Sequence, residues 1–224
     1  MTDFEAQRKR MVADQLRGRG IRDELVLAAM EKVCREAFVA DRYCFMAYED
    51  GPLPIGEGQT ISQPYVVAFM IEALALKGGE KVLEIGAGSG YAAAVLSEIA
   101  GEVYAIERIG PLAEKAASNL ESQGYGNVHV RHADGTRGWE EFAPFDAVLV
   151  SAGAPEIPGT LKMQLAEGGR LVVPVGTSRL AQELTRVTRL EDGRFDRKVL
   201  ADVRFVPLIG EGGWQDPMAE TFPI

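Results

Sequence analysis

Cysteine and histidine are both scarce in this chain of 224 residues, which contains two of each. Cys34 and Cys44 do not form a CxxC pair, and His129 and His132 have no cysteine or acidic cluster at ligand spacing. A structural zinc site usually needs about four such ligands, so the sequence predicts no metal site. We expect both cysteines to be reduced and partly buried.

Long apolar runs are also absent. No stretch reaches the ~18 apolar residues of a membrane helix, and the charged N-terminus has no apolar signal core, so we expect a cytoplasmic protein with no membrane partner. Lys and Arg number 24 against 33 Asp and Glu, which gives a net charge of −9. Because phosphate binding depends on clustered positive charge, nucleic-acid partners are disfavoured.

The chain does contain enough apolar material for a substantial core, with 46% hydrophobic residues. Its length and the lack of a linker predict one domain over residues 1–224. Residues 1–80 carry two amphipathic helices and a loop, with Asp23 as the candidate N-cap of the second helix. Residues 81–175 alternate strands with helices, including a short helix at residues 161–165 that the glycines at 168–169 are expected to end. Residues 176–224 are rich in β-strand patterns, with two of the strands expected at residues 195–200 and 203–206. They end in a Gly-rich tail from residue 210 onward, which we expect to be loosely held.

The most informative stretch is residues 81–91, where a short apolar strand pattern ends in a glycine-rich turn and a helical pattern follows. Glycines allow a sharp turn at which backbone N–H groups can face a nucleotide-like ligand. Gly86, Gly88 and Gly90 alternate, so the third glycine comes one residue earlier than in the dinucleotide-binding turn. The pattern therefore resembles the S-adenosylmethionine site of Rossmann-like methyltransferases more than an NAD site.

Acidic residues accompany this turn. Glu84 lies in the strand before it, and Glu107 ends the next predicted strand, where its carboxylate can accept hydrogen bonds from ribose hydroxyls. Asp134 and Gly135 follow the third predicted strand, at the edge where open α/β sheets bind ligands. Asp134 has two interpretations: it accepts a hydrogen bond from an adenine amino group, or it forms a simple Asp-Gly turn.

A segment dense in Gly and Pro, residues 47–64, precedes the strand and predicts a long loop of the kind that binds ligands. Pro64 opens the next helix, so Ser62 or Gln63 is the expected N-cap. Ser62 therefore has two interpretations as well. It caps this helix, or it faces the reactive end of the cofactor together with Thr60 and Gln59.

Three stretches together closely resemble the protein-L-isoaspartate O-methyltransferase family, namely residues 52–64, 83–91 and 204–208. Residues 58–64 are the most specific of these, because other methyltransferases share only the glycine-rich part. The resemblance implies an α/β Rossmann-like fold with a seven-stranded, mostly parallel sheet and an N-terminal helical extension on the acceptor side. It implies that Ser62 is the active-site serine, and that S-adenosylmethionine binds at Glu84, Gly86, Gly88, Glu107, Asp134 and Gly135.

The implied reaction moves a methyl group from S-adenosylmethionine to the free α-carboxylate of an isoaspartyl residue in a damaged protein, which initiates repair and leaves S-adenosylhomocysteine. A carboxylate is ionised near pH 7, so no general base is needed, and Thr60 and Ser62 are expected to orient the acceptor oxygen. Two alternatives stay open. One is a methyltransferase of this fold with a small-molecule acceptor, and the other is a non-catalytic or dinucleotide-binding protein.

Overall fold

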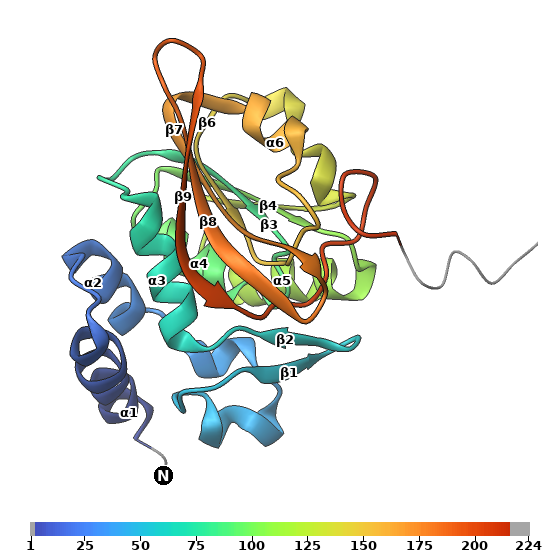
Figure 1. Ribbon diagram of the computed structural model, residues 1–224. Coiled ribbons are helices and arrows are strands. Elements are labelled where there is room, and N and C mark those ends of the chain that lie inside the picture. The colour runs from blue at the N-terminus through green and yellow to red at the C-terminus, as the bar shows by residue number, and fades with distance from the viewer. Residues whose placement is uncertain (1–2, 216–224) are drawn as a thin grey trace, which may run out of the picture.

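The computed structural model describes residues 3–215 and is built on a seven-stranded sheet with the strand order β5-β4-β3-β6-β7-β8-β9 (Figure 1). The first five strands of this order are parallel, and β8 and β9 extend one edge in antiparallel fashion. The mostly parallel α/β sheet expected from the sequence is thus confirmed. The strands are β3 Lys81–Ile85, β4 Glu102–Glu107, β5 Val128–His132, β6 Phe145–Val150, β7 Leu165–Ser178, β8 Ala181–Arg189 and β9 Phe195–Val203.

Helices cover both faces of the sheet, and alternate strand residues serve two separate apolar clusters, as the period of two in a strand requires. On one face Val82 and Val103 join the larger cluster with the N-terminal helices. On the other, Leu83 and Tyr104 pack with Trp139 and the helix α6. The helices are α1 Phe4–Arg10, α2 Glu24–Lys32, α3 Pro64–Leu74, α4 Tyr91–Ser97, α5 Gly110–Ser122 and α6 Gly159–Met163.

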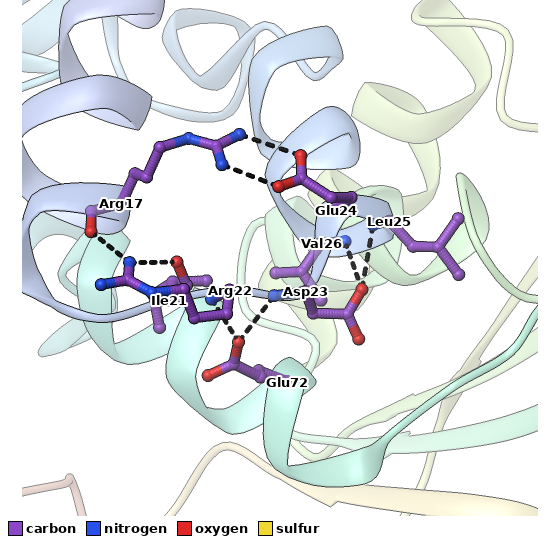
Figure 2. A network of polar contacts seen from close by, with 8 residues as sticks. All are labelled: Arg17, Ile21, Arg22, Asp23, Glu24, Leu25, Val26 and Glu72. Atoms are coloured by element: carbon purple, nitrogen blue, oxygen red, sulfur yellow. Dashed lines mark hydrogen bonds and ion pairs between the residues drawn. The ribbon is translucent and has the colours of Figure 1, made fainter.

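A network of hydrogen bonds and an ion pair holds the N-terminal helices against α3 (Figure 2). The Asp23 carboxylate accepts hydrogen bonds from the amides of Leu25 and Val26 and so caps α2, as its position in the sequence predicts. Glu72 of α3 accepts bonds from the amides of Arg22 and Asp23 at 2.6 and 2.8 Å. Because α3 starts directly after residue 63, this network fixes the helix that follows the predicted acceptor loop.

Residues 47–64 contain more regular structure than the loop expected from the sequence. Leu53–Gly56 (β1) and Gln59–Ile61 (β2) pair as a small antiparallel hairpin that lies beside the lower end of the large sheet in Figure 1. Glu57 and Gly58 form its turn with φ values of 51° and 67°. Two consecutive positive φ values are typical of a two-residue hairpin turn. The prediction of a long loop was therefore wrong for residues 53–61, which form two short strands and their turn.

Boundaries near the C-terminal part also differ from expectation. The helix expected at residues 161–165 is α6, which ends at Met163, and β7 already begins at Leu165, so residues 168–169 do not end the helix. The second strand expected at residues 203–206 is absent from the described chain, where β9 ends at Val203 and isolated bridges follow. The register of β7 against β6 shifts between Leu165 and Arg170, and this irregularity accommodates the glycines without breaking the strand.

The start of the Gly-rich tail, residues 210–214, is held in place together with the residues before it, contrary to the prediction of a loose tail. The Leu208 amide donates to the Gly153 carbonyl at 2.8 Å, and the indole N–H of Trp214 donates to the same carbonyl at 3.0 Å. Arg137 pairs with Glu211. The rest of that predicted tail, residues 216–224, lies outside the described residues. Between residues 3 and 215, none of the helices is both long and apolar enough to cross a membrane.

Candidate active site

The register of the central strands brings three loop positions together. Ile85, Ile106 and Val150 are aligned across β4, β3 and β6. β3 and β6 end there and β4 ends one residue later, so Gly86, Glu107 and Ser151 lie at the same edge of the sheet. In parallel sheets this carboxyl edge is where ligands bind.

The glycine-rich turn has the sharp geometry that the sequence predicts. Gly86, Gly88 and Gly90 have φ values of 86°, 57° and 91°, a region that residues with a Cβ rarely adopt. A Cβ on Gly88 would also lie 3.1 Å from Ile55, and one on Gly90 would lie 3.1 Å from Leu120. Any side chain here would therefore both strain the backbone and narrow the space in front of the turn.

Glu107 holds this turn in place. Its Oε2 accepts a hydrogen bond from the Gly88 amide at 2.9 Å, and its Oε1 accepts one from the Ile109 amide at 2.9 Å. The side chain is buried, with 7% of the residue exposed. Each carboxylate oxygen can accept a further bond, so Glu107 can still receive two ribose hydroxyls.

Glu84 is fully buried and incompletely bonded. Its Oε1 accepts a long 3.5 Å contact from the Ser151 hydroxyl, while Oε2 has no partner among the described residues. Burial, reinforced by the charge of Glu107, raises the pKa of Glu84 to about 8. A cationic group of a ligand bound beside the glycine turn would give this buried carboxyl the partner that it lacks.

Asp134 forms an Asp-Gly turn, which is one of the two roles that the sequence allows for it. Its Oδ1 accepts bonds from the amide and hydroxyl of Thr136, and its Oδ2 accepts one from the Glu211 amide. Burial opposes ionisation, but these hydrogen bonds lower the pKa of Asp134 overall. Gly135 is packed so tightly on Ile85 that a Cβ would overlap it. The adenine interpretation stays a prediction.

Ser62 does not cap α3. Gln63 occupies the N-cap position without a capping side-chain bond, and its amide donates instead to Asp50. Neither the Ser62 hydroxyl nor that of Thr60 is bonded to another residue within 3–215, although the Ser62 carbonyl accepts a bond from Arg35. Both hydroxyls are therefore available to a ligand.

Three hollows meet at the carboxyl edge. The glycine groove, about 110 Å³, runs past Glu107 and Gly135, and the inner pocket, about 40 Å³, contains Glu84. The outer cleft, about 750 Å³, opens between the hairpin segment and the chain after β9. Thr60 and Ser151 line all three hollows, and Ser62 lines the inner pocket and the outer cleft.

Ser151 is a site residue that the sequence-based assignment missed. The sequence shows only a small-residue loop after the strand of residues 146–150. Ser151 is brought to the site by the pairing of β6 with β3, which places it beside Glu84 although the two residues are 67 positions apart in the sequence.

The residues present fit S-adenosylmethionine. The glycine groove offers glycines without side chains and a carboxylate with spare acceptor capacity for a ribose, and the inner pocket offers a buried carboxyl with one unpaired oxygen for the ammonium group. No comparable cluster of metal ligands occurs in residues 3–215. Cys34 and Cys44 are unpaired and half-buried, as expected.

Replacing Glu107 should weaken cofactor binding. Glu107→Ala should lose the charge-assisted bonds predicted between this carboxylate and the ribose, each about 1.5–3 kcal/mol, so the affinity for S-adenosylhomocysteine should fall roughly tenfold or more. Isothermal calorimetry measures this, and Glu102→Gln, at the exposed opposite end of β4, is the matched control. Equal affinities for wild type and Glu107→Ala would contradict the assignment.

The family model described as protein-L-isoaspartate(D-aspartate) O-methyltransferase matches residues 6–213. A relative from Rhodopseudomonas palustris (strain HaA2), named protein-L-isoaspartate O-methyltransferase 1, is 64% identical over 95% of this chain and 87% of its own length. Another from Marinobacter nauticus, named protein-L-isoaspartate O-methyltransferase 2, is 58% identical over 95% of this chain and 97% of its own length.

Solved structures agree. One protein-L-isoaspartate O-methyltransferase superposes with a TM-score of 0.84 at 33% identity, covering 92% of this chain and 67% of that one. A second, from Plasmodium falciparum in complex with S-adenosyl-L-homocysteine, superposes with a TM-score of 0.79 at 27% identity, covering 93% and 99%. The resemblance inferred from the motifs is thereby confirmed. This chain belongs to the protein-L-isoaspartate(D-aspartate) O-methyltransferase family and is an S-adenosylmethionine-dependent methyltransferase.

Proposed function

We propose that the three hollows divide the reaction between them, with the cofactor in the glycine groove and inner pocket and the damaged protein in the outer cleft. The observation that carries this proposal is the meeting of all three at Thr60 and Ser151. The acceptor is the α-carboxylate of an isoaspartyl residue. Within the single domain, residues 1–80 supply the acceptor side and residues 81–175 supply the cofactor side.

Each part of the cofactor is assigned to the lining residues whose chemistry suits it. Glu107 holds the ribose, Gly86, Gly88 and Gly90 leave room for the ligand against the backbone, and Glu84 faces the ammonium group. Asp134 and Gly135 border the adenine end. When bound, S-adenosylmethionine supplies an electrophilic methyl group on a sulfonium.

The protein's own contribution to the chemistry is alignment. The acceptor carboxylate is ionised at neutral pH, so no side chain has to remove a proton. Ser62 and Thr60 present unbonded hydroxyls that can each donate to a carboxylate oxygen and hold its other lone pair toward the cofactor. Correct orientation of two reacting groups can supply about 7–11 kcal/mol of the barrier reduction.

The decisive experiment is methyl transfer from labelled S-adenosylmethionine to an isoaspartyl peptide, followed by mild base, which should release the label because the product is an ester. Small carboxylic acids such as succinate serve as competing acceptors. Labelling of the small acids with none of the peptide would assign the chain a different acceptor while leaving the cofactor site intact.

Removing the Ser62 hydroxyl should lower turnover without lowering stability. Ser62→Ala loses a hydrogen bond to a charged group, which corresponds to a fall in kcat of about tenfold or more. The melting temperature should stay near that of wild type, because Ser62 caps no helix. Ser122→Ala, which removes a serine hydroxyl from the exposed end of α5, is the control. A large melting shift with intact turnover would restore the capping interpretation.

A further inference from the structure

Arg35 is a fully buried arginine that the reaction as described above does not use. It lies in a short helical turn, residues 35–38, with 0% exposure, and no carboxylate among the described residues pairs with it. Burying a guanidinium without an acid is costly, so its remaining contacts must compensate for the lost hydration. Those contacts are therefore informative.

The contacts of Arg35 are main-chain carbonyls at the two ends of the acceptor segment, residues 47–63. Its Nε donates to the Ala47 carbonyl at 2.8 Å, and its Nη2 donates to the Ser62 carbonyl at 2.8 Å. Between these two points the chain forms the β1–β2 hairpin and carries Thr60. One planar, rigid guanidinium thus holds the two ends of the acceptor segment at a fixed position relative to each other.

The same guanidinium also touches the cofactor side. Its central carbon lies 4.7 Å from the centroid of the Tyr91 ring, within the range of a cation–π contact. Tyr91 is the first residue of α4, directly after Gly90, and it lines the inner pocket together with Ser62 and Glu84. Arg35 therefore contacts both Ser62, whose hydroxyl is proposed to orient the acceptor carboxylate, and α4, the helix that follows the glycine turn.

We propose that Arg35 is a positioning residue for methyl transfer, which sets the placement of the Ser62 hydroxyl relative to the cofactor by holding the Ser62 carbonyl and the Tyr91 ring at once. It touches neither substrate nor cofactor and acts through Ser62. The inference rests on the proposed function, since it assigns Ser62 to the acceptor. A displacement of ~1 Å at a reacting group can cost about a hundredfold in rate, so a single lost bond at the Ser62 carbonyl has a measurable effect.

A double-mutant cycle separates positioning from simple stabilisation. Arg35→Lys keeps the charge but cannot reach both carbonyls and the ring in the same way, so kcat with an isoaspartyl peptide should fall about 10- to 100-fold. In a Ser62→Ala background the same change should cost less than about twofold, because the group through which Arg35 acts is gone. The affinity for S-adenosylhomocysteine should stay within about threefold, since Glu107 and the glycine turn are unchanged.

Arg170 provides the matched control. Its guanidinium also donates to backbone carbonyls, those of Leu74 and Ala75 at 2.6 and 3.2 Å at the end of α3 away from the three hollows, and that of Gly168 at 3.3 Å. Arg170→Lys should lower the melting temperature and leave kcat near that of wild type.

Equal losses for Arg35→Lys in the wild-type and Ser62→Ala backgrounds would overturn the proposal, as would unchanged kcat in folded Arg35→Lys. If that variant does not fold, Arg35→Gln retains an amide donor without the buried charge and enters the same cycle. Failure of the proposed function looks different, because wild type itself then leaves the isoaspartyl peptide unlabelled.

Discussion

An isoaspartyl peptide should be methylated at least about a hundredfold faster than its aspartyl isomer, given the steep cost of ~1 Å misplacement. In the isoaspartyl linkage the chain runs through the side-chain carbonyl, so the free α-carboxylate is attached directly to the branch carbon. A normal aspartate carries its carboxylate one methylene further out. Both groups are anionic at neutral pH, so the enzyme must discriminate by reach.

In the proposed arrangement, reach is a strict criterion. The glycine turn held by Glu107 would fix the cofactor, and a hairpin held at both ends would fix the acceptor. The measurement uses two peptides that differ only in the linkage, labelled S-adenosylmethionine, and an acid quench to preserve the ester. Equal labelling of the two peptides would show that linkage is not recognised.

The affinity for S-adenosylhomocysteine should rise by about fiftyfold between pH 6 and pH 8, because Glu84 must give up a proton before it can pair with the ligand's ammonium group. Burial and the charge of Glu107 raise the pKa of Glu84 to about 8. Below that pH the carboxyl is mostly protonated, and binding includes the cost of ionising it. Calorimetry in buffers of different ionisation enthalpy would also detect the released proton.

Glu84→Gln should bind more weakly at pH 8 and lose the pH dependence between 6 and 8. Equal affinity of wild type at both pH values would contradict the pairing. Stability gives an independent check. Between pH 4.5 and 8 the folded protein retains a proton that the unfolded chain has lost, so the contribution of Glu84 to stability falls as the pH rises through this window. The melting temperature of Glu84→Gln relative to wild type should therefore be higher at pH 8 than at pH 5.

Much of the cofactor half could be predicted because its requirements are local. Gly86, Gly88 and Gly90 have positive φ values, which favour glycine at each of these positions. Glu107 is the last residue of β4, so the strand itself places its carboxylate at the edge of the sheet. The Asp23 cap was predicted for the same reason, since an N-cap acts on amides two and three residues away.

The rest of the candidate site could not be predicted to the same depth, because its contacts are distant in the sequence or made by the backbone. The β1–β2 turn uses Glu57 and Gly58, which lack the Asn-Gly or Asp-Gly signature of such turns. Arg35 and Trp214 both bind main-chain carbonyls, which every residue possesses. Ser151 acquires its place only through strand pairing.

The pairing of β3 with β6 in the interior of the sheet also bears on the order in which the protein folds. Strand β6 lies 65 residues further along the chain than β3, and such non-local pairing is slow compared with the formation of helices. The N-terminal helices share their apolar cluster with Tyr91 and Leu96 of α4. We therefore expect the acceptor half, although it leaves the ribosome first, to acquire its final shape last, when the sheet that carries the cofactor turn has closed beneath it.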